Sequence, residues 1–520
     1  MLEPLPSSHW NEKMAAHLLL RAGFGATPAE VQEWTTLGMD ASVDRLVDWE
    51  KTPDPTPNPE WAKPDPTLAQ RRRELRSLTE EQRRIKMMEY QREERQHIQE
   101  LKNWWLERMW NGPRPLQEKM TLFWHGHFAT SVEKVKVAFF MWRQNDLFRR
   151  LGNGKFGDLL LEAGRDPAML VWLDGAQSRK AQPNENYGRE LLELFTLGEG
   201  NYTEDDIKAA AASFTGWTVN RFNQESSFVK NNHDDGRKTF LGVSGEFGDQ
   251  EIVDQILKQR ACARYMAQKI WSFFVYESPG PSMVQALGDE LNRLDYELRP
   301  FLKMMFRSTE FYSAKARGTQ IKSPVQWLLA TAKAVEMDRL PGRGALGLLT
   351  QLGQNLLEPP SVKGWDGGRT WISTNTLLLR QNAAKLFIYG GDAGGVMFNR
   401  DDASQRLAKI QEQRKAQAAK DGTTMTMQDD PMMARLERMK DRKMQMQPVV
   451  DSRRLTTPDT AKDSTALIND LAKRFYPAGV PATARKAFED YLRQSADKPA
   501  DEKVKGLVYL MMARPEYQLT

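Results

Sequence analysis

The stretch "PNENYGRELLELFTLGEGNYTED" (residues 183–205) carries the features that decide the fold. Its leucines recur at helical spacing, and the Pro-Asn-Glu lead-in supplies a cap for a helix that begins near Asn186. After a glycine-containing loop, Thr203 caps a second helix whose first turn is acidic, as the helix dipole favours. Two capped helices joined by a short loop are typical of a helical protein.

The same pattern continues along most of the chain, whereas strand-like alternation is scarce. Only residues 217–243, which contain Gly and Asn, suggest a short hairpin. We therefore predict an all-α fold with a large multi-helical domain. Helices are expected at 11–22, 27–38, 41–49, 67–110, 115–128, 134–151, 156–163, 186–197, 203–215, 250–276, 281–294, 298–308, 323–336, 344–356, 373–388, 464–494 and 501–513.

Composition divides the chain into five segments. The predicted segments are an N-terminal helical part (1–51), a Pro-rich loop with a long charged helix (52–110), a main helical domain (111–400), a charged Met-rich insertion (401–463) and closing C-terminal helices (464–520). The long helix at 67–110 is predicted to be a solvated arm, with a coiled-coil partner contact as the alternative. The insertion is low in aromatic residues and is expected to be flexible. Its thioethers would also suit cuprous copper.

Overall composition limits the classes of function. The 74 basic and 69 acidic residues nearly balance, and no basic stripe with interleaved aromatics indicates nucleic-acid binding. The single Cys262 excludes an intramolecular disulfide and a multi-cysteine zinc site. No apolar run reaches about 18 residues, so no integral membrane segment is expected. The first residues also lack the pattern of a signal peptide.

Several long motifs resemble the bacterial family of unknown function DUF1800. They are "HLLLRAGFGATPAEV" (17–31), "FWHGHFATS" (123–131), "PNENYGRELLELFTLGEGNYTEDDIKAAAASFTGW" (183–217), "IKSPVQWL" (321–328) and "PPSVKGWDGGRTWISTNTLLLRQN" (359–382). The resemblance spans nearly the whole chain, apart from the 52–100 region and the Met-rich insertion.

The resemblance implies no established reaction. Members are often exported, and they are commonly encoded beside a second uncharacterised family similar to sulfatases and phosphatases, which is the partner that the resemblance implies. In this chain the resemblance begins only at His17. A cytoplasmic location is therefore expected from the sequence as given, unless a leader has been omitted.

The segment His125-Gly126-His127 is the most metal-like feature, because two of the six histidines lie within three residues. Neutral imidazoles with carboxylates suit Zn, Mn or Fe. Together with Glu190 and Glu193, these histidines would make a His-His-Glu-Glu set. The alternatives are buried imidazoles that fix helix packing, and acid–base catalysis without a metal.

The helix near residue 186 presents a polar stripe. Asn186, Glu190 and Glu193 share one face by the i, i+4, i+7 rule, and Arg189 lies one turn from Glu185. Carboxylates beside apolar bulk must pair with cations, accept hydrogen bonds or bind a metal. We expect Asn186, Arg189, Glu190 and Glu193 to be catalytic residues, with the two glutamates as ligands or as a general base and Arg189 as an anchor for an anion or a carboxylate.

Two further segments are candidate substrate contacts. The stretch at 359–376 combines Trp365, Asp366, Arg369 and Trp371, and exposed tryptophans beside Asp and Arg suit a sugar or an anion. Structural turns and a helix cap are the alternative explanation. His233 lies in the turn-prone "NNHDDGRKTFLG" (231–242), where an Asx turn competes with a substrate-contacting loop.

Two functional hypotheses follow. The first is a hydrolytic enzyme with a polar, metal-containing cleft that acts on a carbohydrate or ester substrate. The second is a non-catalytic helical scaffold in which the same polar groups form a buried network and the arm recruits a partner. The sequence contains no nucleophile elbow, no phosphate loop and no dinucleotide fingerprint.

Overall fold

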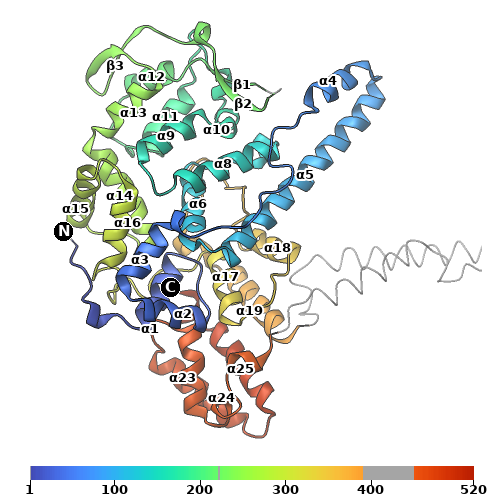
Figure 1. Cartoon of the computed structure of the whole chain (residues 1–520), viewed down its shortest axis with the longest axis vertical. Coiled ribbons are helices and arrows are strands. Elements are labelled where there is room, and N and C mark those ends of the chain that lie inside the picture. Colours follow the sequence, from blue (N-terminus) through green and yellow to red (C-terminus); the bar gives the residue numbers. More distant parts are fainter. Residues whose placement is uncertain (1, 221–222, 391–449) are drawn as a thin grey trace, which may run out of the picture. The chain divides into compact units, whose positions relative to one another are not determined.

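Helices make up most of the computed structural model, which describes residues 2–220, 223–390 and 450–520 (Figure 1). The strands among these residues form two short antiparallel hairpins. The predicted all-α class is therefore confirmed. The chain divides into two compact units: the first comprises Met1–Ile321, Gln354–Gly368 and Thr520, and the second comprises Lys322–Gly353 and Arg369–Leu519.

The first unit begins with helical segments and continues into the two hairpins and a further group of helices. Its helices are α1 (Glu12–Arg21), α2 (Pro28–Leu37), α3 (Met39–Val47), α4 (Leu68–Ser77), α5 (Glu80–Asn111), α6 (Pro115–His127), α7 (Val132–Val135), α8 (Ala138–Leu151), α9 (Phe156–Arg165), α10 (Pro167–Trp172), α11 (Glu185–Glu193), α12 (Glu204–Ser213), α13 (Asp249–Leu257), α14 (Arg260–Phe274), α15 (Pro281–Arg293) and α16 (Leu298–Arg307).

The predicted caps are present. The Thr27 hydroxyl accepts from the backbone N–H of Glu30, whose carboxylate accepts from Thr27 in return. Asn184 caps α11 by accepting from the N–H of Tyr187. Thr203 caps α12 in the same reciprocal way as Thr27. These local hydrogen bonds satisfy orphan N–H groups, which explains why the starts of these helices could be predicted.

The charged arm differs from the prediction of one helix over 67–110. It is a hairpin of α4 and α5, in which α4 folds back along the first half of α5 (Figure 1). Thr79 starts α5 with a capping box that includes Gln82, and this box competes with a continuous helix. The Arg71 guanidinium pairs with Glu93 across the hairpin at 2.8 Å. Similarly, the single helix predicted over 250–276 is two helices, α13 and α14.

Residues 217–243, predicted to hold one hairpin, contribute to two. Strand β1 (Trp217–Asn220) pairs with β2 (Glu225–Phe228), and β3 (Arg237–Phe240) pairs with β4 (Val243–Glu246). The second turn consists of Leu241 and Gly242, both with positive φ, as a tight two-residue hairpin requires.

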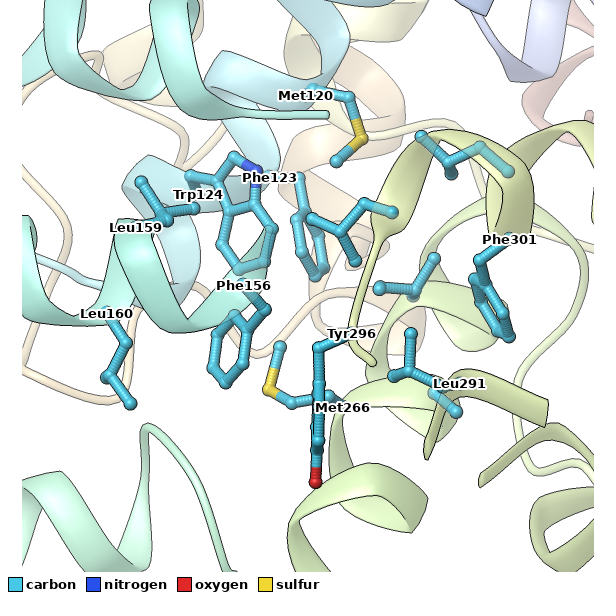
Figure 2. Close-up of a cluster of buried hydrophobic side chains, with 14 of the residues drawn as sticks. Met120, Phe123, Trp124, Phe156, Leu159, Leu160, Met266, Leu291, Tyr296 and Phe301 are labelled. Atoms are coloured by element: carbon cyan, nitrogen blue, oxygen red, sulfur yellow. The ribbon is translucent and has the colours of Figure 1, made fainter. Parts of the chain in front are cut away.

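A buried apolar cluster holds α6 against α9 and α14 (Figure 2). Phe123 and Trp124 of α6 lie in this cluster with Phe156 of α9 and Met266 of α14. The Trp124 indole also donates to the carbonyl of Gly152 at 2.9 Å. The aromatic residues before His125 therefore fix the end of α6 in the core.

The second unit is also helical. It contains α17 (Pro324–Ala334), α18 (Arg343–Gln351), α19 (Thr374–Tyr389), α22 (Ser452–Leu455), α23 (Ser464–Phe475), α24 (Ala482–Gln494) and α25 (Ala500–Ala513). Ser373 caps α19, as predicted. Most of the predicted Met-rich insertion, 401–449, lies outside the described residues. Its remainder is folded, because Val450 and Leu455 are buried and α22 forms.

Short 3₁₀ helices complete the described secondary structure. They are η1 (Ser7–His9), η2 (Trp49–Lys51), η3 (Gly175–Gln177), η4 (Lys230–Asn232), η5 (Gly368–Trp371), η6 (Thr460–Lys462) and η7 (Pro515–Gln518).

Candidate functional site

His125 and His127 lie in the last turn of α6, within the first unit. The His125 ring is 1% exposed and lies edge-on to Trp105, with the Trp365 ring 5.8 Å away between centroids. Its buried Nε2 has no hydrogen-bond partner among the described residues. Burial lowers the pKa of His125 to about 3, so the ring is neutral at pH 7.

His127 uses both ring nitrogens inside the protein. Nε2 lies 3.0 Å from the carbonyl oxygen of Phe195, so it carries the hydrogen and donates. Nδ1 is then the acceptor, and it lies 3.3 Å from Nζ of Lys269. Burial and the charge of Lys269 lower the pKa of His127 well below its usual value. The imidazole is therefore a neutral link between a lysine and a backbone carbonyl.

Lys269 extends from α14 toward the end of α11. Besides His127, its Nζ lies 3.4 Å from the carbonyl oxygen of Leu194 and 5.0 Å from the centre of the Tyr265 ring. Among the described residues, no carboxylate lies within ion-pair distance of this ammonium. Burial and the charge of Lys363 lower the pKa of Lys269 to about 8. The side chain is mostly charged at pH 7, yet it can lose its proton under mildly alkaline conditions.

The loop of residues 361–368 packs directly on the His-Gly-His segment. Gly364 has a φ of +85°, and a Cβ built on it would lie 2.0 Å from the carbonyl oxygen of Gly126. In the same loop, Lys363 pairs with Asp366 at 2.8 Å, and the half-buried Trp365 lies over Gly126. The structure thus brings the predicted Trp-Asp motif to the predicted histidine motif.

The polar face of α11 borders the segment that holds Lys269. The Tyr202 hydroxyl donates to the Glu193 carboxylate at 2.9 Å, and the Tyr265 hydroxyl donates to the carbonyl of Leu194. Glu190 is half-buried, and burial followed by the charge of Glu193 raises its pKa. Carboxyl, phenol and ammonium groups with shifted pKa values therefore gather around the C-terminal end of α11.

Comparison with known protein families matches the chain to one family. The family model described as "Protein of unknown function (DUF1800)" covers residues 17–519. The chain belongs to the DUF1800 family. The resemblance carried by the sequence motifs is thus confirmed. No curated protein and no solved structure matches the chain.

The described part of this DUF1800 protein contains no helix that combines the length and the apolar character needed to cross a membrane.

The predicted four-ligand metal set is not assembled. Among the described residues, no three His, Cys, Asp or Glu side chains lie close enough together to hold a metal ion. Both nitrogens of His127 have partners, and one of these partners is a cationic lysine, which opposes a metal cation. Glu193 accepts instead from Tyr202. The set that the structure does not form is His125, His127, Glu190 and Glu193.

Arg189 does not pair with Glu185, as the helical spacing suggested. Its guanidinium forms two hydrogen bonds with the carboxylate of Glu204, at 2.8 and 2.9 Å, across the α11–α12 contact. The two side chains are 40% and 65% exposed. Asn186 is also exposed. This end of the polar stripe is therefore a solvated surface. The Arg189 guanidinium, which was predicted to anchor an anion, is engaged by the Glu204 carboxylate.

The other predicted substrate contacts lie elsewhere in the DUF1800 chain. Trp371 is only 6% exposed within the second unit, so the prediction of an exposed aromatic surface is wrong for this residue. Arg369 is exposed and belongs to the same unit. His233 bonds through Nδ1 to the carbonyl of Thr215 at 2.8 Å. The adjoining Asp234 makes the Asx turn that was the structural alternative, because it accepts from the N–H of Gly236.

Sequence reasoning missed Lys269, Tyr265 and Tyr202. Lys269 and Tyr265 lie one turn apart at the border of an amphipathic helix, which is a common arrangement with no functional signature. Tyr202 stands nine residues after Glu193, in a loop whose path is not encoded by a local pattern. Only the tertiary fold reveals that these residues border the predicted motifs.

Proposed function

We propose that this DUF1800 protein is a hydrolytic enzyme acting on an ester or carbohydrate substrate at the surface where α11, α14 and the 361–368 loop meet. The observation that carries the proposal is Lys269, a largely buried ammonium with no carboxylate partner among the described residues. A buried cation of this kind costs solvation free energy. Such groups concentrate at functional sites, where they stabilise developing negative charge.

In this proposal, Lys269 supplies positive charge to the oxyanion that forms when water attacks an ester carbonyl. His127 is a positioning residue, because its Nδ1 accepts from Lys269 while its Nε2–H is held by Phe195. The neutral ring orients the ammonium without neutralising it. A lysine without a local carboxylate also favours substrates that carry negative charge near the reacting bond.

Glu190 is the proposed general base that removes a proton from the attacking water. Its pKa is raised by burial and by Glu193, which brings the carboxylate closer to the pKa that is efficient at neutral pH. Glu193 is less available, because it already accepts from the Tyr202 hydroxyl. General-base catalysis of this kind typically contributes about 10²–10⁴-fold.

Trp365 and Asp366 are the proposed substrate contacts. They belong to the loop that packs on Gly126, and Trp365 is only half-buried. An aromatic face beside a carboxylate supports a carbohydrate portion of the substrate, through stacking and hydrogen bonding.

The test is a panel of chromogenic esters and glycosides, with neutral and acidic acyl or sugar groups, assayed with purified protein. Glu190→Gln should lower kcat by about 10²–10⁴-fold. Lys269→Met should lower kcat by about 10²–10³-fold, and Lys269→Arg should restore part of the activity. Lys208→Met and Glu489→Gln are matched surface controls. Absence of any hydrolysis across the panel, or equal activity in Glu190→Gln and the wild type, would count against this assignment.

A second candidate function is a helical scaffold, and the saturated His127 favours it. A ring bonded on both sides to Phe195 and Lys269 ties α6 and α14 to the segment that follows α11 and specifies their packing. The double substitution of His125 and His127 by Phe discriminates between the two functions. A scaffold predicts a large loss of stability with no activity to lose. Elemental analysis of the purified wild type would show whether a divalent metal accompanies either function.

A further inference from the structure

A second group of buried cations lies where α1, α6 and α14 meet. Lys119 of α6 is 4% exposed, and Arg21, the last residue of α1, is 1% exposed. The Lys119 ammonium lies over the rings of Phe24 and Phe273, 4.9 and 5.5 Å from their centres. All of these residues belong to the first unit.

Lys119 has no hydrogen-bond acceptor and no ion-pair partner among the described residues. An ammonium carries three N–H donors, and aromatic faces offer it only a diffuse attraction. Even with both rings in place, burial and the charge of Arg21 lower the pKa of Lys119 to about 7. The local environment therefore does not supply the negative charge that a buried lysine requires.

Arg21 is only partly satisfied. Its terminal nitrogens donate to oxygens of Gln320, Ala316 and Thr520, the last at 2.9 Å. Its Nε is buried without a partner among the described residues. The acid whose charge raises the pKa of Arg21 is the exposed Glu277, which does not come within ion-pair distance.

Three other buried cations of the same unit are paired with carboxylates. Lys102 lies 2.7 Å from the carboxylate of Glu358, and Arg108 and Arg149 both bond to Glu118. Carboxylate pairing is thus how this unit accommodates these three buried positive charges. Lys119 departs from that rule beside a second cation, where like-charge repulsion adds to the cost of burial.

We propose that Lys119 and Arg21 bind an oxyanion group of a small ligand: a phosphate, a sulfate or a carboxylate. Such a group supplies the acceptors that the three Lys119 N–H bonds and the Arg21 Nε–H lack, and it offsets both charges. This site differs from the one around Lys269, and the proposal does not rest on hydrolytic activity.

The test is binding of sodium phosphate, sodium sulfate and sodium acetate to the full chain, by calorimetry and by thermal unfolding. Chloride at matched ionic strength is the reference. At least one oxyanion should bind and raise the Tm of the wild type, as expected for a ligand that prefers the folded state. The three salts distinguish tetrahedral oxyanions from carboxylates. No effect beyond chloride with any of them overturns the proposal.

Lys119→Met should weaken binding by at least about tenfold, since charge-assisted hydrogen bonds are lost. The matched control is Lys322→Met. Lys322 is 2% exposed and its pKa is also lowered to about 7, but it donates to the carbonyl of Tyr517 at 2.7 Å. Equal loss of binding in both variants would refute the assignment to Lys119.

If Lys119→Met does not fold, Lys119→Arg and Arg21→Lys keep the charge and provide the second test. Each should still bind the oxyanion but with an altered preference among the three salts, because a planar guanidinium and a compact ammonium match different anions. Affinities identical to those of the wild type for all three salts would show that neither residue contacts the anion.

Discussion

Gly364 is the position where a single methyl group should separate the 361–368 loop from α6. Its φ of +85° lies in the left-handed region, and a Cβ would lie 2.0 Å from the carbonyl oxygen of Gly126 and 3.0 Å from the carbonyl carbon. Both atoms belong to the backbone of a buried helix end, so neither can rotate away. Gly364→Ala must therefore move the loop, and Trp365 and Asp366 with it.

The expected cost has two parts. The left-handed backbone costs an alanine about 1–2 kcal/mol, and overpacking against fixed atoms costs about 1–3 kcal/mol more. Gly367 in the same loop isolates the first part, because its φ is +76° but nothing lies within 4 Å of a Cβ built there. Gly367→Ala should thus cost only the backbone share, which leaves a difference of about 1–3 kcal/mol between the two variants.

Urea unfolding followed by circular dichroism would measure that difference, and amide hydrogen exchange would locate it. Peptides that cover 119–128 and 356–368 should exchange faster in Gly364→Ala than in Gly367→Ala, because the contact between them opens. Hydrolytic activity should likewise be lower in Gly364→Ala than in Gly367→Ala. If the two variants were equally stable and equally protected, the loop would not pack on the His-Gly-His segment as described.

Three further outcomes follow from particular groups. Glu118→Gln should destabilise the protein by about 3–5 kcal/mol in urea unfolding, since it leaves the buried Arg149 without a carboxylate and leaves Arg108 with Asp54 alone. Burial alone would raise the pKa of Glu118, but Arg149 and Arg108 lower it below its usual value. The stability that the Glu118 carboxylate contributes is therefore present above its pKa in the unfolded chain and is lost as the pH falls through its pKa in the folded protein. The stabilities of the wild type and of Glu118→Gln should accordingly converge in acid. The labelling of Lys269 by an amine reagent, followed by mass spectrometry as a function of pH, should reach half of its maximal rate near pH 8. A midpoint at the pH of an ordinary lysine would contradict the burial of this side chain. Thr79→Ala should loosen the start of α5 by about 1 kcal/mol, seen as faster local exchange with no change elsewhere.

Helix type and helix starts were predictable because their causes are local. Side-chain caps such as those of Thr27 and Thr203 act within three residues, and the apolar period of a helix is visible in its own sequence. The errors arose where two local signals competed. Helical periodicity favoured one helix over 67–110, whereas the capping box at Thr79 divided it in two. The periodic pattern was the more conspicuous signal, but the cap determined the chain path.

The candidate site was only half predictable. The motifs around His125 and Trp365 were identified from unusual residue types, and the structure places them in contact. The partners of each group were not predictable, because they come from distant segments. Arg189 found Glu204 rather than Glu185, and Lys269 reached His127 across 142 residues. Motifs indicate where polar groups concentrate, but tertiary packing decides which of them meet.

The two proposed sites are connected by the packing of α6 against α14. Lys119 contacts Phe273 and His127 contacts Lys269, so both pairs bridge α6 and α14. Lys119 and His127 are eight residues apart on α6, which corresponds to about 12 Å along the helix axis. A ligand that used both ends would hold its anionic group at Lys119 and its reacting bond near Lys269. With such a ligand, Lys119→Met should raise KM if the Lys119 contact is equally strong in the bound substrate and in the transition state, and should lower kcat if the contact strengthens in the transition state. If the two sites are independent, Lys119→Met should leave both KM and kcat unchanged.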